Sequence, residues 1–290
     1  MSSRRSDTIE AQNSAKNSDE FTVLVPVANP RSEAHLITIG SAIAKQRSGR
    51  VVAVTLINVP DQTSLYAAKQ QFQYDEEKNL LAGAERTASV FGASIETHTV
   101  FTHEQFKTIF NSARRYNANL CIMGWGPAIP GIDGRTEGII DELANSLPCD
   151  FLIYKDRGFD PAKILLPTSG GPHTALAAIV ARSMQLAFGS QVTLLHVNDG
   201  PGGKSFLDTW AHDHDLDDAT QRIESGNIGT AIESVAADHT MIIIGATEAG
   251  VLSRLARGSL TIDVLNHVNC SVLIAERKTN RGLFERVFHR

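Results

Sequence analysis

The stretch ILLPTSGGPHTALAAIVARSMQLAFGSQVTLLHV, residues 164–197, decides the fold of this chain. It begins and ends with short apolar runs, ILLPT (164–168) and GSQVTLLHV (189–197), which are typical of strands buried on both faces of a parallel sheet. The segment between them, 174–188, is apolar nearly all round and is followed by Gly189, which favours a buried helix with a left-handed C-cap. The stretch therefore predicts a strand, a helix and a second, parallel strand, the unit of a doubly wound α/β sheet.

The chain contains this pattern twice. VLVPV (23–27) and GRVVAVTLINV (49–59) flank an earlier helical stretch, and the first strands of the two copies are offset by 141 residues. Two later pairs match at an offset of 121: NLCIMG (119–124) with TMIIIG (240–245), and LPCDFLIYK (147–155) with VNCSVLIAE (268–276). The difference of 20 residues lies in the middle of the repeat, where the first copy carries the long helical segment 66–91.

The repeat divides the chain into domains. Each copy predicts five strands that alternate with helices, so we expect one domain at 21–156 and a second at 162–276, joined by DRGFD. Residues 1–20 are polar and mixed in charge, and we expect them to be disordered. Residues 277–290 form a basic, amphipathic tail, for which contact with an anionic membrane surface, contact with a partner protein and packing on its own domain all remain open.

The composition, with 42% hydrophobic and 20% charged residues, is that of a globular protein. The formal net charge of −5 argues against nucleic acid as the main partner. The three cysteines, Cys121, Cys149 and Cys270, are few and odd in number, which favours packed thiols in a reducing compartment over a disulfide or zinc framework. Apolar runs such as ALAAIVA (175–181) are far shorter than the roughly 20 residues of a membrane span. No signal peptide is recognisable, so we expect a cytoplasmic protein.

The loop after the strand 240–245 is the main candidate for a binding site. It contains Gly245, Glu248 three residues later, and Gly258-Ser259 before the helical run LTIDVLNHV. Glycines after a strand, and a Gly-Ser pair opening a helix, let backbone amides and the helix dipole approach a phosphate. The same residues also suit a plain turn followed by a helix cap, and spacing alone leaves both interpretations open.

Several motifs together resemble the universal stress protein (UspA-type) family in its tandem-domain form. They are ILLPT, LLHV, and GATEAGVLSRLARGS followed by CSVLIA, and the chain is similar to the paired UspA domains of archaeal proteins and of amino-acid permease cytosolic tails. The resemblance implies two tandem, doubly wound, parallel five-stranded sheets of the adenine nucleotide alpha hydrolase-like type. It also implies that the last strands, FLIYK (151–155) and SVLIA (271–275), pair to form an internal pseudo-dimer, with a homodimer as a further option.

The resemblance implies an adenine nucleotide, ATP or AMP with Mg²⁺, in the second domain. The chain keeps the family's Gly245, Gly258-Ser259 and Val197, but it has Glu248 where a second glycine is expected and Ser169 where an aspartate is expected. A carboxylate about 4 Å from a phosphate costs about 4 kcal/mol at an intermediate dielectric. The residues expected at this site are Thr168, Ser169, Val197, Gly245, Ala246, Glu248, Gly258, Ser259 and Leu260.

The first copy departs further from the family pattern. Gly124 remains, but Pro127 replaces the second glycine, Glu137-Gly138 replaces the Gly-Ser pair, and Ala28 replaces the aspartate. Glu137 would place a negative charge where a phosphate should meet helix amides. We therefore expect no nucleotide in the first domain.

Other motifs point to ordinary structure. NDGPGGKS (198–205) lacks the first glycine of a P-loop, and we interpret it as a flexible connector. HDHDLDD (212–218) has no identifiable distant ligand and is interpreted as a solvated acidic loop, so no metal site is predicted. Cys149 and Cys270 occupy equivalent positions, which favours core packing, and His173 is expected at a helix start on the surface.

Three functions follow as hypotheses. The first is a regulatory or sensory module that binds an adenine nucleotide in its second domain. The alternative is an interaction domain without nucleotide, acting on an amino-acid transporter or a stress pathway. A slow nucleotide hydrolase ranks last, because no general base, nucleophile or metal cluster can be identified; we therefore predict no catalytic residues and no enzyme.

Overall fold

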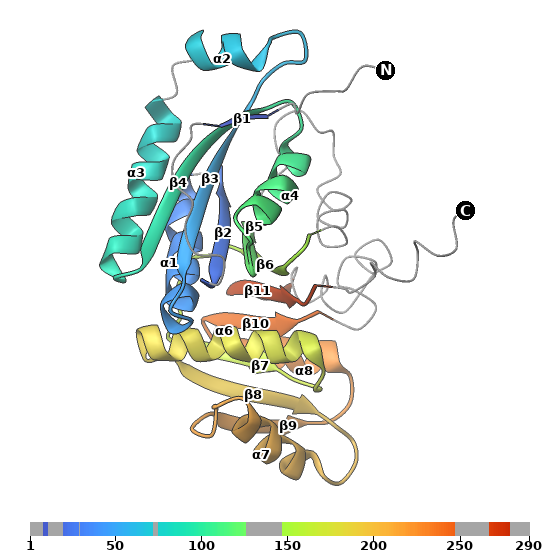
Figure 1. Ribbon diagram of the computed structural model, residues 1–290. Helices are drawn as coiled ribbons and strands as arrows, with labels where there is room; N and C mark the ends of the chain where they lie inside the picture. Colours follow the sequence, from blue (N-terminus) through green and yellow to red (C-terminus); the bar gives the residue numbers. More distant parts are fainter. Residues whose placement is uncertain are drawn as a thin grey trace, which may run out of the picture.

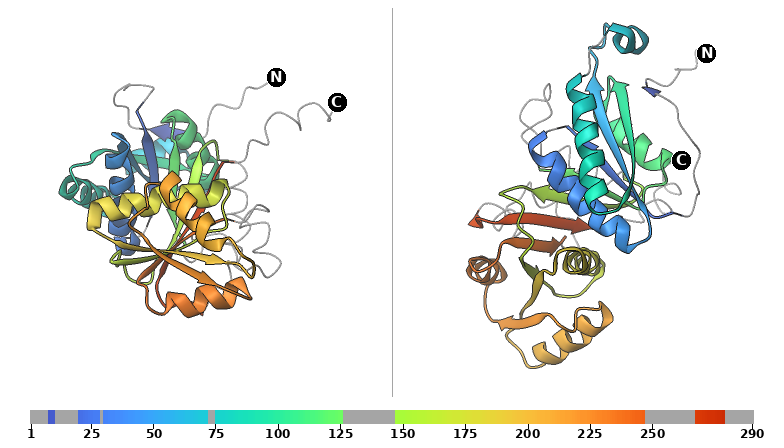
Figure 2. Two further views of the ribbon diagram at one scale, coloured as in Figure 1. Left: turned by 90° about the horizontal axis from the view of Figure 1, so that it is seen from below. Right: turned by 90° about the vertical axis from the view of Figure 1, so that its left-hand side faces the viewer.

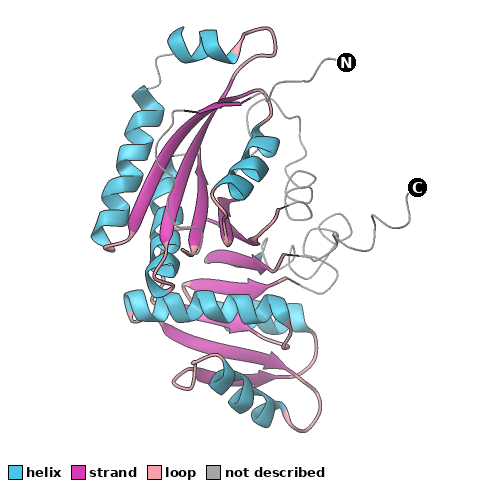
Figure 3. Ribbon diagram, in the orientation of Figure 1, coloured by secondary structure: helices cyan, strands magenta, loops and turns pink. Residues whose placement is uncertain are grey.

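The computed structural model describes residues 8–10, 20–28, 30–71, 75–125, 147–246 and 267–278. Strands and helices alternate in both halves of the chain (Figures 1 and 3). The elements of domain 1 are β2 (Thr22–Val27), α1 (Pro30–Gln46), β3 (Arg50–Asn58), α2 (Leu65–Gln71), α3 (Asp75–Val90), β4 (Ser94–Thr102), α4 (Gln105–Arg115), β5 (Leu120–Gly124) and β6 (Asp150–Lys155). Those of domain 2 are β7 (Lys163–Pro167), α6 (Pro172–Phe188), β8 (Gln191–Val197), α7 (Gly203–Asp213), β9 (Thr220–Glu224), α8 (Ile228–Ala236), β10 (Met241–Gly245) and β11 (Ser271–Glu276).

Together with a short strand near the N-terminus, β1 (Thr8–Glu10), the strands form one sheet in the order β1-β4-β3-β2-β5-β6-β11-β10-β7-β8-β9. Within each domain the neighbouring strands are parallel, and the order 4-3-2-5-6 in domain 1 repeats as 9-8-7-10-11 in domain 2. The sheet twists so strongly that the strands of domain 1 run across those of domain 2 (Figures 1 and 2). The predicted fold class, two doubly wound parallel sheets, is confirmed.

The two domains join through their last strands. β6 and β11 pair antiparallel, with Ile153 opposite Ile274 at the middle of the register. These two residues differ by 121, the offset between the two sequence repeats in this region, so each faces its own counterpart. A pseudo-two-fold axis therefore passes through this pair, and the predicted internal pseudo-dimer is confirmed.

The N-terminal segment departs from the expectation in one place. Thr8–Glu10 forms β1, which pairs antiparallel with the end of β4 at Val100–Thr102. The expected disorder of residues 1–20 therefore does not hold for these three residues. A strand of three residues is too short to show the alternating pattern from which a strand is predicted.

Both faces of the sheet carry a hydrophobic core that crosses the domain junction. The core on the α1 and α6 side joins Val25 and Ile37 of domain 1 to Leu166 and Met184 of domain 2. The core on the α4 and α8 side is likewise built from both domains. At the junction the ring of Phe188 contacts those of Phe91 and Phe159 edge to face, at centroid distances of 5.5 and 5.8 Å. The two domains thus share their apolar interior.

Polar contacts around Ser271 fix the linker between the domains. The Ser271 hydroxyl accepts hydrogen bonds from Tyr154 Oη (3.1 Å) and the Arg157 amide (2.9 Å) and donates to the Gly158 carbonyl (2.8 Å). Asp156 in turn contacts His35 Nδ1 of α1 at 2.7 Å. The linker is therefore held to both domains.

The segment 66–91, for which the sequence predicts a long helical insertion, contains α2 and α3. A separate small cluster lies beneath α2 and consists of Ile57, Val59, Leu65, Ala68 and Phe101. This cluster covers the carboxyl ends of β3 and β4. Domain 2 has only the shorter connection through α7 at the corresponding place.

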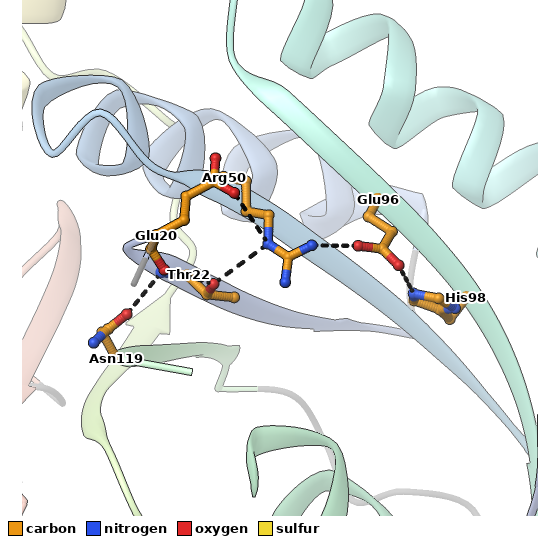
Figure 4. A network of polar contacts seen from close by, with 6 residues as sticks. All are labelled: Glu20, Thr22, Arg50, Glu96, His98 and Asn119. Carbon is orange, nitrogen blue, oxygen red and sulfur yellow. Dashed lines mark hydrogen bonds and ion pairs between the residues drawn. The ribbon is translucent and has the colours of Figure 1, made fainter. Parts of the chain in front are cut away.

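A partly buried polar network occupies the amino edge of domain 1 (Figure 4). Arg50, whose side chain is 9% exposed, donates from Nη1 to Glu96 Oε2 at 2.5 Å and lies 3.8 Å from Glu20 Oε2. The other oxygen of Glu96 contacts His98 Nε2 at 2.9 Å. The network thereby ties together the beginnings of β2, β3 and β4.

Glu33, in the first turn of α1, is a buried carboxyl group that faces α3. It is 6% exposed, its Oε1 atom has no hydrogen-bond partner, and a Cβ atom added at Gly83 would lie 3.0 Å from Oε2. Burial raises the pKa of Glu33, and the Arg86 guanidinium offsets part of that effect. The folded state therefore favours the protonated acid.

We expect Glu33→Gln to stabilise the protein by about 1 kcal/mol at pH 8 and to have little effect near pH 4. Below the unfolded-state pKa, Glu33 is protonated in both states and costs nothing. As the pH rises towards and through the raised folded-state pKa, the unfolded chain ionises first, so the wild type loses stability that the variant keeps. Urea unfolding of both proteins across this pH range measures the difference, and a gap that stays constant with pH would contradict it.

Candidate functional site

The carboxyl edge of domain 2 is the candidate site. β7 pairs with β8 on one side and with β10 on the other, so the strand order reverses at β7. In open α/β sheets ligands bind outside the carboxyl ends of the strands at such a switch point. Of the expected site residues, this edge brings together Thr168 and Ser169 after β7, Val197 at the end of β8, and Gly245 and Ala246 at β10.

Thr168 holds the loop after β7 in place. Its amide donates to the Leu195 carbonyl at 2.8 Å, its carbonyl accepts from His196 Nδ1 at 3.0 Å, and its hydroxyl accepts from the Gly170 amide at 3.3 Å. The side chain of Thr168 is buried, whereas that of Ser169 is exposed. Thr168 is therefore a structural anchor, and Ser169 is the residue of this pair that can meet a ligand.

Gly245 is required by the packing of α6. A Cβ atom added there would lie 2.6 Å from Thr174 N, 2.7 Å from His173 C and 2.9 Å from Thr174 Cα. In domain 1 the equivalent Gly124 has only ordinary contacts, the nearest being Leu36 Cδ1 and Ser32 Oγ at 3.7 Å. The start of α6 thus lies directly on the end of β10, and this contact by itself accounts for the glycine.

Val197 and Ala246 complete the described part of the site. Val197 is half-buried and packs against the core on the α8 side, leaving part of its surface open at the strand end. Ala246 is buried, and its amide donates to the Ala275 carbonyl at 2.8 Å. Glu248, Gly258, Ser259 and Leu260 lie outside the described residues, as do Pro127, Glu137 and Gly138 of domain 1.

Sequence reasoning missed a link between this edge and domain 1. Arg277, which follows β11, donates from Nη1 to Asp150 Oδ2 of β6 at 2.6 Å, and the Lys278 amide donates to Asp150 Oδ1 at 3.0 Å. The Arg277 amide also donates to Nδ1 of His173, at the start of α6. His173 is therefore half-buried and hydrogen-bonded, not a free surface residue. The offset of 121 could have pointed to part of this link, since Lys278 and Asp150 correspond to Arg157 and Ser271.

The remaining motifs have structural roles where they are described. Gly203, from the P-loop-like stretch, begins α7, where an added Cβ atom would lie 3.4 Å from both His196 and Ile223. In the acidic loop, His212 Nδ1 contacts Asp217 at 3.1 Å on the surface. Among the described residues no group of three or more His, Cys, Asp or Glu side chains is arranged to hold a metal ion.

The cysteines are packed to different degrees. Cys121 and Cys149 are buried, and Cys270 is half-buried. Burial raises the pKa of Cys149 to about 12, with the neighbouring Asp150 carboxylate adding to the effect. A thiol that stays protonated is a poor nucleophile. The predicted packing role is confirmed for Cys149, while its counterpart Cys270 is less enclosed.

Comparison with known proteins identifies the relatives of this chain. The model of the universal stress protein family matches residues 21–155 and 210–276, more than half of the chain. A universal stress protein from Archaeoglobus fulgidus DSM 4304 has a similar structure, with 13% identity, a TM-score of 0.62, and coverage of 88% of this chain and 98% of that one. The cytoplasmic domain of a prokaryotic cation chloride cotransporter is similar at 10% identity and a TM-score of 0.61, over 88% of this chain and 95% of that domain.

One curated relative is a transport protein. The Na(+)/H(+) antiporter NhaS5 of Synechocystis sp. is 27% identical over 185 residues, which cover 61% of this chain and 26% of the antiporter. The chain thus spans about a quarter of the length of that relative. Within the part of this chain that the structure describes, none of the helices has the length and apolar character to cross a bilayer.

Proposed function

This chain belongs to the universal stress protein family, and from that premise we propose that it is a cytoplasmic regulatory module that binds an adenine nucleotide in domain 2. The ligand is ATP or AMP with Mg²⁺, and domain 1 serves as a scaffold without nucleotide. The proposed activity is binding, not catalysis. One observation supports the proposal most directly. An exposed Ser169, a half-buried Val197 and the end of β10 all lie at the carboxyl edge of the second sheet, where the strand order reverses.

The two domains differ at this edge in ways that favour domain 2. Domain 1 has Ala28 in place of Ser169 and carries the α2 cluster over the ends of β3 and β4. The Gly258-Ser259 pair that suits a phosphate occurs only in the second copy of the sequence. Glu248 acts in the opposite direction, because its carboxylate repels a phosphate unless it turns outward or Mg²⁺ lies between them.

The first test is whether the purified protein carries a nucleotide. Denatured protein applied to an anion-exchange column should release ATP, ADP or AMP, and adding Mg-ATP to nucleotide-free protein should raise its melting temperature. A clean column trace together with an unchanged melting temperature would reject nucleotide binding.

We expect Ser169→Asp to bind Mg-ATP or Mg-AMP roughly tenfold more tightly than the unmodified chain. The added carboxylate can accept a hydrogen bond from a ribose hydroxyl at this exposed position. Ala28→Asp is the matched control, since Ala28 is also exposed and follows the first strand of domain 1, and it should leave the affinity unchanged. Titration calorimetry measures both, and an equal gain in the two variants would contradict the assignment to domain 2.

A second candidate function is favoured by the antiporter similarity. In this alternative the chain regulates a membrane transporter through protein contacts and binds no nucleotide. It predicts that the unmodified chain releases nothing on denaturation, whereas the double variant Glu248→Gly/Ser169→Asp gains nucleotide binding. Micromolar affinity of the unmodified chain for nucleotide would reject this alternative.

A further inference from the structure

The amino edge of domain 2, opposite the candidate nucleotide site, contains a depression with a volume of about 690 Å³. It lies beside the first residues of β7, β8 and β9 and the loops that follow α6 and α8. Its size falls within the range of about 300–1,000 Å³ found for small-molecule sites. Nothing in the nucleotide function uses this edge.

The depression exists because domain 2 lacks the network that fills the same place in domain 1. Arg50 pairs with Thr22 in the sheet as Gln191 pairs with Lys163, and the amides of Arg50 and Gln191 each donate to the residue before their neighbouring strand, at 2.9 Å. Two residues further along these strands, Val52 pairs with Glu96 and Thr193 with Thr220. Gln191 and Thr220 therefore replace Arg50 and Glu96, and the shorter side chains leave the space open.

The charged side chains that line the depression can bind a ligand that supplies the guanidinium group which Arg50 supplies in domain 1. These side chains are Asp218, Asp238 and Lys163, and two aspartates against one lysine give a formal charge of −1. Asp218 is held in place, because Gln185 Nε2 donates to its Oδ2 at 2.9 Å while Arg182 Nη1 donates to Gln185 Oε1 at 2.6 Å. Within the part of the chain that the structure describes, Oδ1 of Asp218 accepts no hydrogen bond and can accept one from a further donor.

We propose that this depression binds a guanidinium-bearing amino acid of the arginine type. Domain 1 supplies the internal precedent, since it holds a guanidinium at the equivalent place between the carboxylates of Glu20 and Glu96. In domain 2 the ligand guanidinium pairs with Asp218, because planar guanidinium groups match carboxylates through paired hydrogen bonds. Asp238, which comes before β10, lies about three strand spacings away from Asp218, which comes before β9, and it pairs with the ligand's α-ammonium group. The ligand carboxylate pairs with the exposed ammonium of Lys163. The whole ligand has a net charge of about +1 at neutral pH, which complements the formal charge of the residues that line the depression.

Titration calorimetry of the full chain with L-arginine, agmatine and L-citrulline tests the proposal. L-arginine should bind, agmatine should bind more weakly because it has no carboxylate, and L-citrulline should not bind because its side chain is uncharged. Asp238→Asn and Asp218→Asn should each weaken L-arginine binding roughly tenfold or more. Lys163→Met should lower the affinity for L-arginine to that for agmatine and leave agmatine binding unchanged.

Asp213→Asn is the matched control, an exposed carboxylate at the end of α7 outside the depression, and it should not alter binding. Circular dichroism shows whether each variant remains folded, and surface Asp→Asn changes should leave the fold intact. No heat with L-arginine at millimolar concentration, equal binding of L-citrulline, or unaltered binding in the two aspartate variants would each overturn the proposal.

Discussion

Gly245→Ala should destabilise the protein by about 3 kcal/mol, the upper part of the range for overpacking substitutions. The new Cβ atom would lie 2.6–2.9 Å from atoms of the His173 and Thr174 backbone, not from the flexible end of a side chain. To make room, the start of α6 would have to move away from β10. Ala177, Val180, Ala181 and Met184 of that helix are buried without measurable exposure, so the movement would open the core along its length.

Gly124→Ala is the matched control for this prediction. It occupies the equivalent position in domain 1, where the nearest atoms to an added Cβ lie at 3.7 Å, and it should change the stability by less than about 0.5 kcal/mol. Urea unfolding monitored by circular dichroism measures both variants. Equal losses in the two proteins would show that the close approach of α6 to β10 is not the reason for the glycine.

Arg50→Met should cost about 3 kcal/mol, because it leaves the Glu96 carboxylate without its main partner. Glu96 is only 26% exposed, and after the substitution the described contact that remains to it is that of its Oε1 atom with His98 Nε2 at 2.9 Å. Breaking one side of an enclosed ion pair costs more than removing both sides. The double variant Arg50→Met/Glu96→Met should therefore recover much of the loss.

Gln191→Met, the same change at the equivalent position of domain 2, is the control and should stay within about 0.5 kcal/mol of the unmodified chain. A double-mutant cycle from thermal or urea unfolding gives the coupling between Arg50 and Glu96. If the losses of stability in Arg50→Met and Glu96→Met simply add up to the loss in the double variant, there is no direct interaction between the two side chains.

The repeat made most of the fold predictable. The two matched strands 147–155 and 268–276 gave the offset of 121, and the antiparallel register of Ile153 with Ile274 follows the same offset. The buried helix that ends at Gly189 was predictable because apolar periodicity and a glycine cap are both local signals, and Gly189 does adopt a left-handed conformation with φ of 69°. Features that depend on a few adjacent residues were thus recovered.

What the sequence could not show depends on contacts between distant residues. The role of Gly245 depends on how closely the start of α6 approaches the end of β10. Arg50 meets Glu96 only because β3 and β4 pair in the sheet. The ion pair between Asp150 and Arg277 joins residues 127 positions apart. Four of the nine expected site residues, Glu248, Gly258, Ser259 and Leu260, lie outside the described residues, and the assignment of the site to a nucleotide stays a prediction.

The antiparallel pairing of β6 with β11 has a consequence for how the two halves can change over time. Two separate copies of one gene product that associate through these strands would need to be identical, and their association would weaken on dilution. Here a short linker keeps the strands at a high effective concentration, so the contact survives dilution. Each half is then free to diverge: domain 1 has filled its amino edge with Arg50 and Glu96 and covered the ends of β3 and β4 with the α2 cluster, whereas domain 2 has left a depression at its amino edge.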